Sequence, residues 1–258
     1  LDGHQVKLLA NIESNKEVKT LHKYGAEGVG LYRTEFLYLA ATTLPGEREL
    51  YENFKQVVQE MDNRPVVIRT LDIGMDKQFG DVRNDNEVNP ALGLRGIRLS
   101  LAKPQLMADQ LKGILRASFY GNVKILYPMI CSVTEIIQAN KMLEDAKNHL
   151  RQEQIPFNEE IEVGAMIETP AAAICIDHIL KEVDFVSIGT NDLIQYLLAV
   201  DRVNESVAHL YQPFHPSVLR TLKNIMKSAE NAGKKVSICG ELGGDPMATM
   251  LLLGLGKF

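Results

Sequence analysis

The sequence has little of what marks secreted, membrane-inserted or nucleic-acid-binding proteins. Only three cysteines occur in 258 residues, Cys131, Cys175 and Cys239, and none forms a CxxC pair. This argues against a disulfide framework and a cysteine zinc site. No apolar run approaches the ~18 residues of a membrane-spanning helix. The net charge of −5 provides no basic excess for nucleic acid. We therefore expect a cytoplasmic protein without membrane insertion or a nucleic-acid partner.

Short apolar runs alternate with longer amphipathic segments along the chain, which is the order of a parallel α/β fold. Several runs are apolar almost throughout, as in strands that are buried on both faces. The patterns predict strands over residues 7–12, 28–32, 66–71, 94–97, 124–129, 162–167, 185–188 and 236–239. They predict helices over residues 16–24, 47–61, 104–117, 133–153, 171–181, 216–232 and 246–253.

Eight predicted strands in a chain of 258 residues favour a closed barrel. A dinucleotide-binding sheet would need a GxGxxG turn between the first strand and its helix, and none is present. The nearest match, Gly28-Val29-Gly30, lies inside a predicted strand and lacks the third glycine. We therefore predict an α/β fold, a (β/α)8 TIM barrel that forms a single domain over residues 1–258.

Polar residues follow most of the predicted strands. In a barrel, the C-terminal ends of all strands meet at one mouth, where catalytic residues lie, so these side chains are expected to converge. They are Arg33, Thr34, Glu35, Arg69, Thr70, Asp72, Arg95, Arg98, Glu168, Asn191, Asp192, Cys239 and Glu241.

The chemistry of this set fits a small phosphorylated acid. Arginine binds phosphate and carboxylate oxygens with two parallel hydrogen bonds and stays charged. Glu168 and Asp192 are hard oxygen ligands of the kind that Mg2+ takes together with substrate phosphate. Each residue also has a purely structural explanation, such as a surface ion pair or a helix start, and Cys239 alone reads as a small buried hydrophobe. The structural explanation weakens because it must be repeated at six strands.

Several ordered motifs resemble those of a known family. Residues 28–37 (GVGLYRTEFL), 163–172 (VGAMIETPAA), 187–193 (SIGTNDL) and 239–241 (CGE) resemble segments of the pyruvate/phosphoenolpyruvate-utilising enzymes. Residues 69–74 (RTLDIG), 199–202 (AVDR) and 210–213 (LYQP) look like enzyme I of the bacterial sugar phosphotransferase system. The resemblance spans essentially the whole chain.

This resemblance implies a homodimeric barrel that binds phosphoenolpyruvate with Mg2+. The phosphoryl group would pass to a histidine on a separate N-terminal domain and then to the carrier HPr, with release of pyruvate, as the first step of sugar uptake by this system. By matched motif, Arg33 and Arg69 would hold the phosphoryl group, and Glu168 and Asp192 would ligate Mg2+.

The resemblance assigns further roles around the same mouth. Asn191, Asp192 and Arg202 would contact the phosphate or carboxylate of the substrate. Arg95 would line the mouth, with Lys77 as a weaker candidate. Cys239 would be the general acid that protonates the methylene carbon of enolpyruvate, because a thiol with a pKa of about 8.5 can give and regain a proton near neutral pH.

The family's phosphohistidine segment, a glycine-rich GGxxSH-like turn, is absent from these residues. We therefore expect a fragment of a longer enzyme, which binds substrate but does not complete the transfer unless the N-terminal domain is supplied. Four alternatives stay open. Two keep the same pocket: the equivalent barrel of a phosphoenolpyruvate synthase or pyruvate phosphate dikinase, and a module of a multidomain phosphoryl-transfer protein. The other two are a non-catalytic dimerisation or regulatory module and an unrelated magnesium-dependent barrel, such as an aldolase or enolase-type enzyme.

Overall fold

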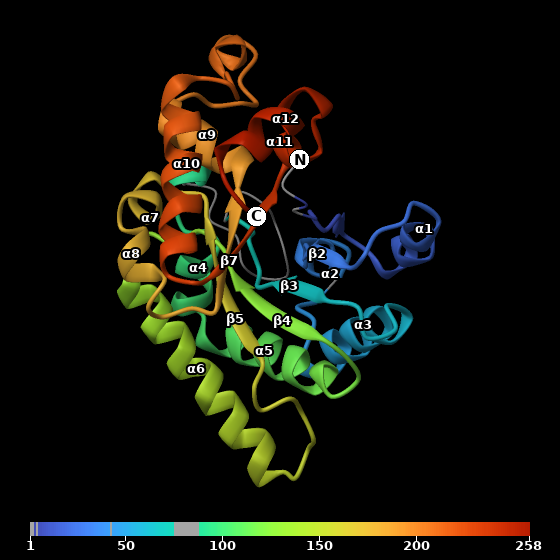
Figure 1. Ribbon diagram of the computed structural model, residues 1–258. Coiled ribbons are helices and arrows are strands. Elements are labelled where there is room, and N and C mark those ends of the chain that lie inside the picture. Colours follow the sequence, from blue (N-terminus) through green and yellow to red (C-terminus); the bar gives the residue numbers. More distant parts are fainter. Residues whose placement is uncertain (1–2, 4, 42, 75–87) are drawn as a thin grey trace. The chain divides into compact units, whose positions relative to one another are not determined.

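The structure is a computed structural model that describes residues 3, 5–41, 43–74 and 88–258 (Figure 1). Its strands are β1 (Ala10–Ile12), β2 (Val29–Tyr32), β3 (Val66–Arg69), β4 (Val123–Tyr127), β5 (Glu162–Ile167), β6 (Phe185–Gly189) and β7 (Lys235–Cys239). The helices are α1 (Val18–Lys23), α2 (Glu35–Leu39), α3 (Glu47–Glu60), α4 (Ile97–Ala102), α5 (Pro104–Ser118), α6 (Val133–Gln152), α7 (Pro170–Ile174), α8 (Ile176–Ile179), α9 (Thr190–Leu198), α10 (Pro216–Asn231), α11 (Glu241–Gly244) and α12 (Pro246–Leu255). Short 3-10 turns are η1 (Asn15–Glu17), η2 (Pro90–Leu92) and η3 (Ala208–Leu210).

The predicted α/β class is confirmed, since parallel strands alternate with helices along the chain. Seven of the eight predicted strands are present within a few residues of their expected bounds. Each of the predicted helices is also present, and the one expected over residues 171–181 is divided into α7 and α8.

The strand predicted over residues 94–97 is wrong. In the described part of the chain, the β pairing of Arg95 is an isolated antiparallel bridge with Gly74, outside any strand. Gly96 has a φ of +57°, in the left-handed region that interrupts extended backbone, and Ile97 begins helix α4. Ile97 and Leu99 are fully buried from this helix, so their hydrophobicity serves helix packing and not a strand.

The chain divides into two compact units, and each is described by itself. Unit 1 comprises Leu1–Pro128 and Ile137–Val163. In this unit β1, β2, β3 and β4 pair side by side in parallel, in chain order (Figure 1). Helices α3 and α5 pack against each other. Gly113 permits their close approach, because a Cβ there would lie 3.1 Å from the Cβ of Leu50.

Unit 2 comprises Met129–Ile136 and Gly164–Phe258, and its strands β5, β6 and β7 are also parallel and in chain order. Gly189 at the end of β6 is paired with Cys239 at the end of β7. The residues that follow these two strands therefore start from the same edge of the sheet, which places the beginnings of α9 and α11 near each other. The prediction of a single domain over residues 1–258 stays a prediction.

Among the described residues, no helix is both long enough and apolar enough to cross a membrane.

Candidate functional site

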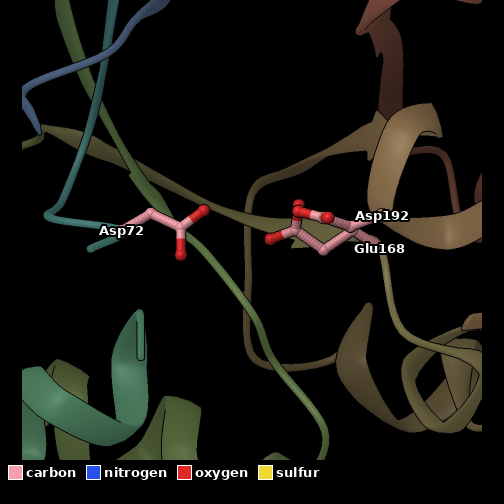
Figure 2. Close-up of side chains that lie close together, drawn as sticks. All are labelled: Asp72, Glu168 and Asp192. Carbon is pink, nitrogen blue, oxygen red and sulfur yellow. The ribbon is translucent and has the colours of Figure 1, made fainter. Parts of the chain in front are cut away.

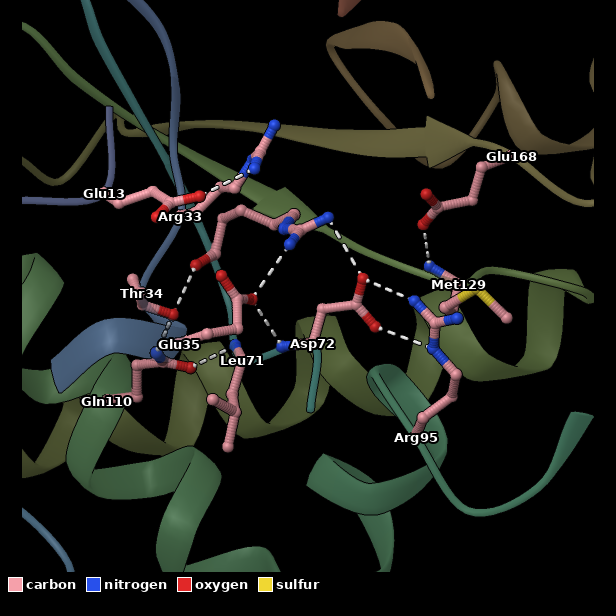
Figure 3. Close-up of polar contacts among 11 residues, drawn as sticks. Glu13, Arg33, Thr34, Glu35, Leu71, Asp72, Arg95, Gln110, Met129 and Glu168 are labelled. Carbon is pink, nitrogen blue, oxygen red and sulfur yellow. Dashed lines mark hydrogen bonds and ion pairs between the residues drawn. The ribbon is translucent and has the colours of Figure 1, made fainter. Parts of the chain in front are cut away.

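Unit 1 holds a buried network of arginines and carboxylates at the ends of β2 and β3 (Figure 3). The Asp72 carboxylate accepts hydrogen bonds from Arg95 Nε at 3.2 Å and from Arg95 Nη2 at 2.9 Å. Arg69 Nη1 lies 3.0 Å from the same carboxylate. Glu35 receives Arg69 Nη2 and the backbone N–H of Asp72, each at 2.9 Å. The Asp72 side chain is only 2% exposed. Two arginines predicted as site residues, Arg69 and Arg95, are thus brought together by Asp72.

A second layer of hydrogen bonds fixes the backbone beneath this network. Thr34 donates its hydroxyl to the carbonyl of Arg69 at 3.1 Å, and Gln110 donates to the Thr34 hydroxyl at 3.0 Å. The other amide atom of Gln110 accepts from the backbone N–H of Leu71 at 2.9 Å. Thr34 and Gln110 are buried, so these bonds are shielded from water and hold the β3 terminus in place.

The charges of this network cancel, because two guanidinium groups face the carboxylates of Glu35 and Asp72. Each guanidinium carries five N–H donors in a planar fork, a geometry that matches carboxylate and phosphate oxygens. The arrangement can present oriented N–H groups to an anion without an excess of positive charge. Glu35 and Asp72 were visible in the sequence as strand-end acids, but nothing in the sequence indicated that they would hold the arginines.

Arg33 lies apart from these contacts. Its guanidinium pairs with Glu13 at 2.7 Å, and the two side chains are 36% and 58% exposed. Such an exposed pair contributes little to stability, so Arg33 can exchange Glu13 for another anion at small cost. Lys77 lies outside the described residues.

Unit 2 contains two buried acids at the ends of β5 and β6. Glu168 and Asp192 are 2% and 8% exposed. Each offers a carboxylate oxygen within 4.8 Å of the other, and Figure 2 shows the two groups facing each other. One oxygen of Glu168 accepts the backbone N–H of Met129 at 2.6 Å (Figure 3). Two buried carboxylates at this separation repel each other, which a divalent cation between them would relieve.

Gly189 provides the space that Glu168 occupies. A Cβ at position 189 would lie 2.7 Å from Glu168 Oε2, closer than real Cβ atoms approach other atoms. Thr169, directly after Glu168, caps α7 by accepting the Ala172 N–H at 3.1 Å and donates to the carbonyl of Ile130 at 2.7 Å. The Glu168 carboxylate is therefore fixed at a defined place by its surroundings.

Asn191 and Glu241 are joined across the ends of β6 and β7. Asn191 Nδ2 donates to Glu241 Oε1 at 3.3 Å, and the Glu241 N–H donates to Asn191 Oδ1 at 3.0 Å. Arg202 Nη1 lies 3.8 Å from the same Glu241 carboxylate. Two predicted substrate contacts, Asn191 and Arg202, are thus linked through an acid that the sequence did not single out for a role.

Tyr211 and Gly240 support this corner of the site. The Tyr211 hydroxyl donates to the Asn191 carbonyl at 3.3 Å, and burial raises the pKa of Tyr211 to about 12. Gly240 has a φ of +95°, and a Cβ there would lie 2.5 Å from Thr190 Oγ1. Only glycine fits this turn without displacing the start of α9.

Cys239 is buried at the end of β7, with 5% of its surface exposed. Its sulfur accepts a hydrogen bond from Ser187 Oγ at 3.2 Å and donates to the Ile188 carbonyl at 3.4 Å. Within unit 2 the structure thus places Glu168, Asp192, Asn191 and Cys239 at consecutive strand ends. The convergence of these residues with the arginines of unit 1 at one mouth stays a prediction.

Comparison with known proteins identifies the family. The family model described as PEP-utilising enzyme, PEP-binding domain, matches residues 1–257. Phosphoenolpyruvate-protein phosphotransferase of Priestia megaterium is 50% identical over 255 residues, which covers 99% of this chain and 44% of that protein. The protein of the same name from Haemophilus influenzae is 48% identical over 256 residues, again 99% and 44%. The chain thus spans less than half the length of these curated relatives.

Solved structures agree with the fold. An HpcH/HpaI aldolase/citrate lyase family protein from Burkholderia cenocepacia aligns with a TM-score of 0.58 over 97% of this chain and 86% of that one, at 14% sequence identity. At this identity the likeness concerns the fold alone. The family match over nearly the whole chain and the relatives at about half identity lead to one conclusion: the chain belongs to the PEP-utilising enzymes and corresponds to their PEP-binding domain.

Proposed function

We propose that this chain is the phosphoenolpyruvate-binding part of a phosphoenolpyruvate-protein phosphotransferase, and that it binds phosphoenolpyruvate together with Mg2+. The observation that carries the proposal is the buried pair of Glu168 and Asp192, whose oxygens lie within 4.8 Å, in a chain of the PEP-binding family. A buried acidic pair is costly without a cation and is useful to a protein that holds a metal with a phosphorylated ligand.

The acidic pair fits the metal that the family resemblance implies. Both ligand groups are carboxylates, the donor type that Mg2+ prefers, and the Gly189 backbone leaves room for Glu168 at the position it occupies. When bound, Mg2+ would neutralise charge on the phosphoryl oxygens. Glu168 and Asp192 would hold it, and Asp192 and Asn191 would also contact the substrate.

The arginines would orient the anionic groups of the substrate. Arg33, Arg69 and Arg95 would bind phosphoryl oxygens through the N–H groups of their guanidinium forks, and Arg202 would bind the carboxylate or phosphate. In-line phosphoryl transfer asks the protein mainly for position and charge stabilisation, which such groups supply. Cys239 would give its thiol proton to the methylene carbon of enolpyruvate, so that pyruvate is released.

The rest of the proposal concerns the whole protein. The curated relatives extend well beyond this chain, which spans 44% of the Priestia megaterium protein. The phosphoryl group would pass to a histidine on a separate N-terminal domain and then to HPr, in a cytoplasmic homodimer that begins sugar uptake. This chain alone would bind substrate and leave the transfer incomplete.

Calorimetric titration of phosphoenolpyruvate into the chain, with Mg2+ and then with EDTA, tests the binding proposal. We expect binding that depends on Mg2+ and falls at least tenfold in Arg69→Ala and in Glu168→Gln. Arg220→Ala and Glu205→Gln, at exposed positions, are matched controls and should keep the affinity of the unchanged chain. Circular dichroism would establish that each variant is folded.

The result also separates the alternatives. A folded chain that binds no phosphoenolpyruvate, or binds it equally well in EDTA, would overturn the proposal and favour a non-catalytic module. If the chain binds phosphoenolpyruvate as expected, the phosphoryl acceptor can be tested by adding phosphohistidine domains in solution. Transfer only to a domain of dikinase type would favour the phosphoenolpyruvate synthase or dikinase alternative.

A further inference from the structure

Two serines form a directed chain of hydrogen bonds that ends on the Cys239 sulfur. Ser237 Oγ donates to Ser187 Oγ at 3.0 Å, and Ser187 Oγ donates to Cys239 Sγ at 3.2 Å. The thiol in turn donates to the Ile188 carbonyl at 3.4 Å. The sulfur therefore accepts a hydrogen bond from a hydroxyl and directs its own S–H toward a backbone carbonyl.

The strand register produces this arrangement. Ser187 on β6 is the direct partner of Ser237 on β7. Side chains alternate across a strand, so Ser237 and Cys239, two residues apart on β7, share one face. Ser187 lies on that face from the neighbouring strand, which brings its hydroxyl between the Ser237 hydroxyl and the Cys239 sulfur. The contact is thus built into the sheet and does not depend on a loop.

A serine at position 187 carries a free-energy cost for folding. Its side chain is fully buried, within the apolar strand Phe185–Gly189, whose residues are all buried. A buried hydroxyl costs free energy unless it is hydrogen-bonded, and alanine or valine would fill a strand position without that cost. The hydroxyl donates to a sulfur, a weak acceptor, so the bond contributes little to stability while the thiol is neutral. It gains strength if the sulfur becomes charged.

We propose that Ser187, supported by Ser237, is a positioning residue that prepares the Cys239 thiol to donate its proton. The inference rests on the proposed function, in which Cys239 protonates enolpyruvate. In that step the acceptor is the enolate of pyruvate. The S–H bond breaks and a C–H bond forms from the electron pair of the carbon–carbon double bond. An electron pair of the enolate oxygen closes the carbonyl of pyruvate, and the S–H pair stays on sulfur as a thiolate. The Ser187 hydroxyl stabilises this thiolate, and donation from Ser237 strengthens the Ser187 O–H as a donor.

The rate of iodoacetamide alkylation at Cys239 measures this effect directly, at one fixed pH near 8. Peptide mass spectrometry separates Cys239 from Cys131 and Cys175. Loss of the hydroxyl in Ser187→Ala should lower the thiolate fraction about tenfold. The remaining thiolate is more nucleophilic, so the expected net effect is alkylation about threefold slower.

Three further variants complete the series. Ser187→Thr keeps the hydroxyl and should restore the rate to within about twofold of the unchanged chain. Ser237→Ala removes only the second link and should slow alkylation less than Ser187→Ala does. Ser206→Ala, at an exposed position, is the matched control and should leave the rate unchanged.

Whether alkylation becomes slower or faster in Ser187→Ala distinguishes a positioning role from a purely structural one. If Ser187 only fills space, its removal loosens the packing around a buried thiol and alkylation becomes equal or faster, which would overturn the inference. If Ser187→Ala folds poorly by circular dichroism, Ser237→Ala, at a half-buried position, gives the same comparison of sign.

Titration of the same variants with phosphoenolpyruvate and Mg2+ keeps this inference separate from the proposed function. Ser187→Ala should bind with unchanged affinity, because its hydroxyl acts on the sulfur. If the unchanged chain binds no phosphoenolpyruvate while Ser187→Ala still slows alkylation, the proposed function fails and the coupling of Ser187 to Cys239 stands. If the unchanged chain binds phosphoenolpyruvate but Ser187→Ala does not slow alkylation, the proposed function stands and the coupling of Ser187 to Cys239 fails.

Discussion

From the arginine network of unit 1, we predict that the Asp72 carboxylate contributes strongly to the stability of the fold. Its carboxylate is 2% exposed and contacts two guanidinium groups, at 2.9 and 3.0 Å. Asp72→Asn preserves the side-chain volume and removes the negative charge that Arg69 and Arg95 share. The new amide also carries an NH2 group, which would face N–H donors instead of accepting from them. Removing one partner of a buried ion pair costs about 3 kcal/mol or more of unfolding free energy.

Urea and thermal unfolding measure this loss. For a chain of 258 residues, about 3 kcal/mol corresponds to a fall in Tm of about 5 °C. Asp177→Asn is a suitable control, because the Asp177 side chain is 69% exposed and its ion-pair partner in the described part of the chain is His178, which is also exposed. We expect the control to change stability by less than about 0.5 kcal/mol.

A double-mutant cycle then assigns the loss to the ion pair. Arg95→Gln should cost much less in the Asp72→Asn background than in the unchanged chain, because the contact it removes is already lost. Equal costs in the two backgrounds, or an Asp72→Asn loss no larger than that of Asp177→Asn, would refute the view that Asp72 fixes these arginines.

Three further substitutions have expected outcomes. Gly240→Ala should lower the unfolding free energy by about 2 kcal/mol or more in urea titrations, since φ is +95° and the new Cβ would meet Thr190, while Gly244→Ala, with open space around it, should not destabilise. Burial raises the pKa of Tyr211 to about 12, above an unfolded value of about 10, so the folded state favours the neutral phenol. The contribution of the Tyr211 phenol to the free energy of unfolding should be complete below pH ~10 and lost as the pH rises toward 12. Between pH 9 and pH 11, the free energy of unfolding should therefore fall less for Tyr211→Phe than for the unchanged chain. Burial opposes the charged form of Glu47, but hydrogen bonds from Lys112 and Arg116 outweigh it and lower the pKa. Glu47→Gln should therefore cost about 1 kcal/mol at neutral pH, and the difference should vanish as the pH falls through the acidic range; a difference that persists in acid would contradict the assigned cause.

The sequence predicted most of the fold because burial and periodicity agree over most of the chain. All four residues of β3 and all five of β6 are buried, which is what a continuous apolar run indicates. The prediction failed at residues 94–97, where the short run Leu94-Arg95-Gly96-Ile97 resembles a strand. There the positive φ of Gly96 and the burial of Ile97 from a helix decide the structure, and neither is encoded in the local pattern.

The strand-end positions of the candidate site residues could be predicted from the sequence one residue at a time, but their hydrogen-bond and ion-pair partners could not. The position of a polar residue after an apolar run indicated Arg69, Glu168 and Asp192 correctly as strand-end residues. The sequence could not show that Asp72 would bridge two arginines, or that Arg33 would turn to Glu13 instead. The Arg33–Glu13 pair joins residues 20 positions apart and the Arg69–Glu35 pair joins residues 34 positions apart. At such separations the spacing of residues in the sequence carries no signal.

The pairing of the arginines also bears on how the network of unit 1 would recognise an anion. Arg69 and Arg95 are 10% and 15% exposed, and carboxylates neutralise both. A neutral cluster in a chain of net charge −5 exerts little long-range attraction, so it would not draw anions in by its field. To a ligand bound as proposed, it would offer two guanidinium forks held at fixed angles in advance, which would lower the entropic cost of binding. Lysine at position 69 would keep the charge and lose the fork, so we expect the geometry of the Arg69 side chain, and not its charge alone, to decide its contribution to the proposed binding.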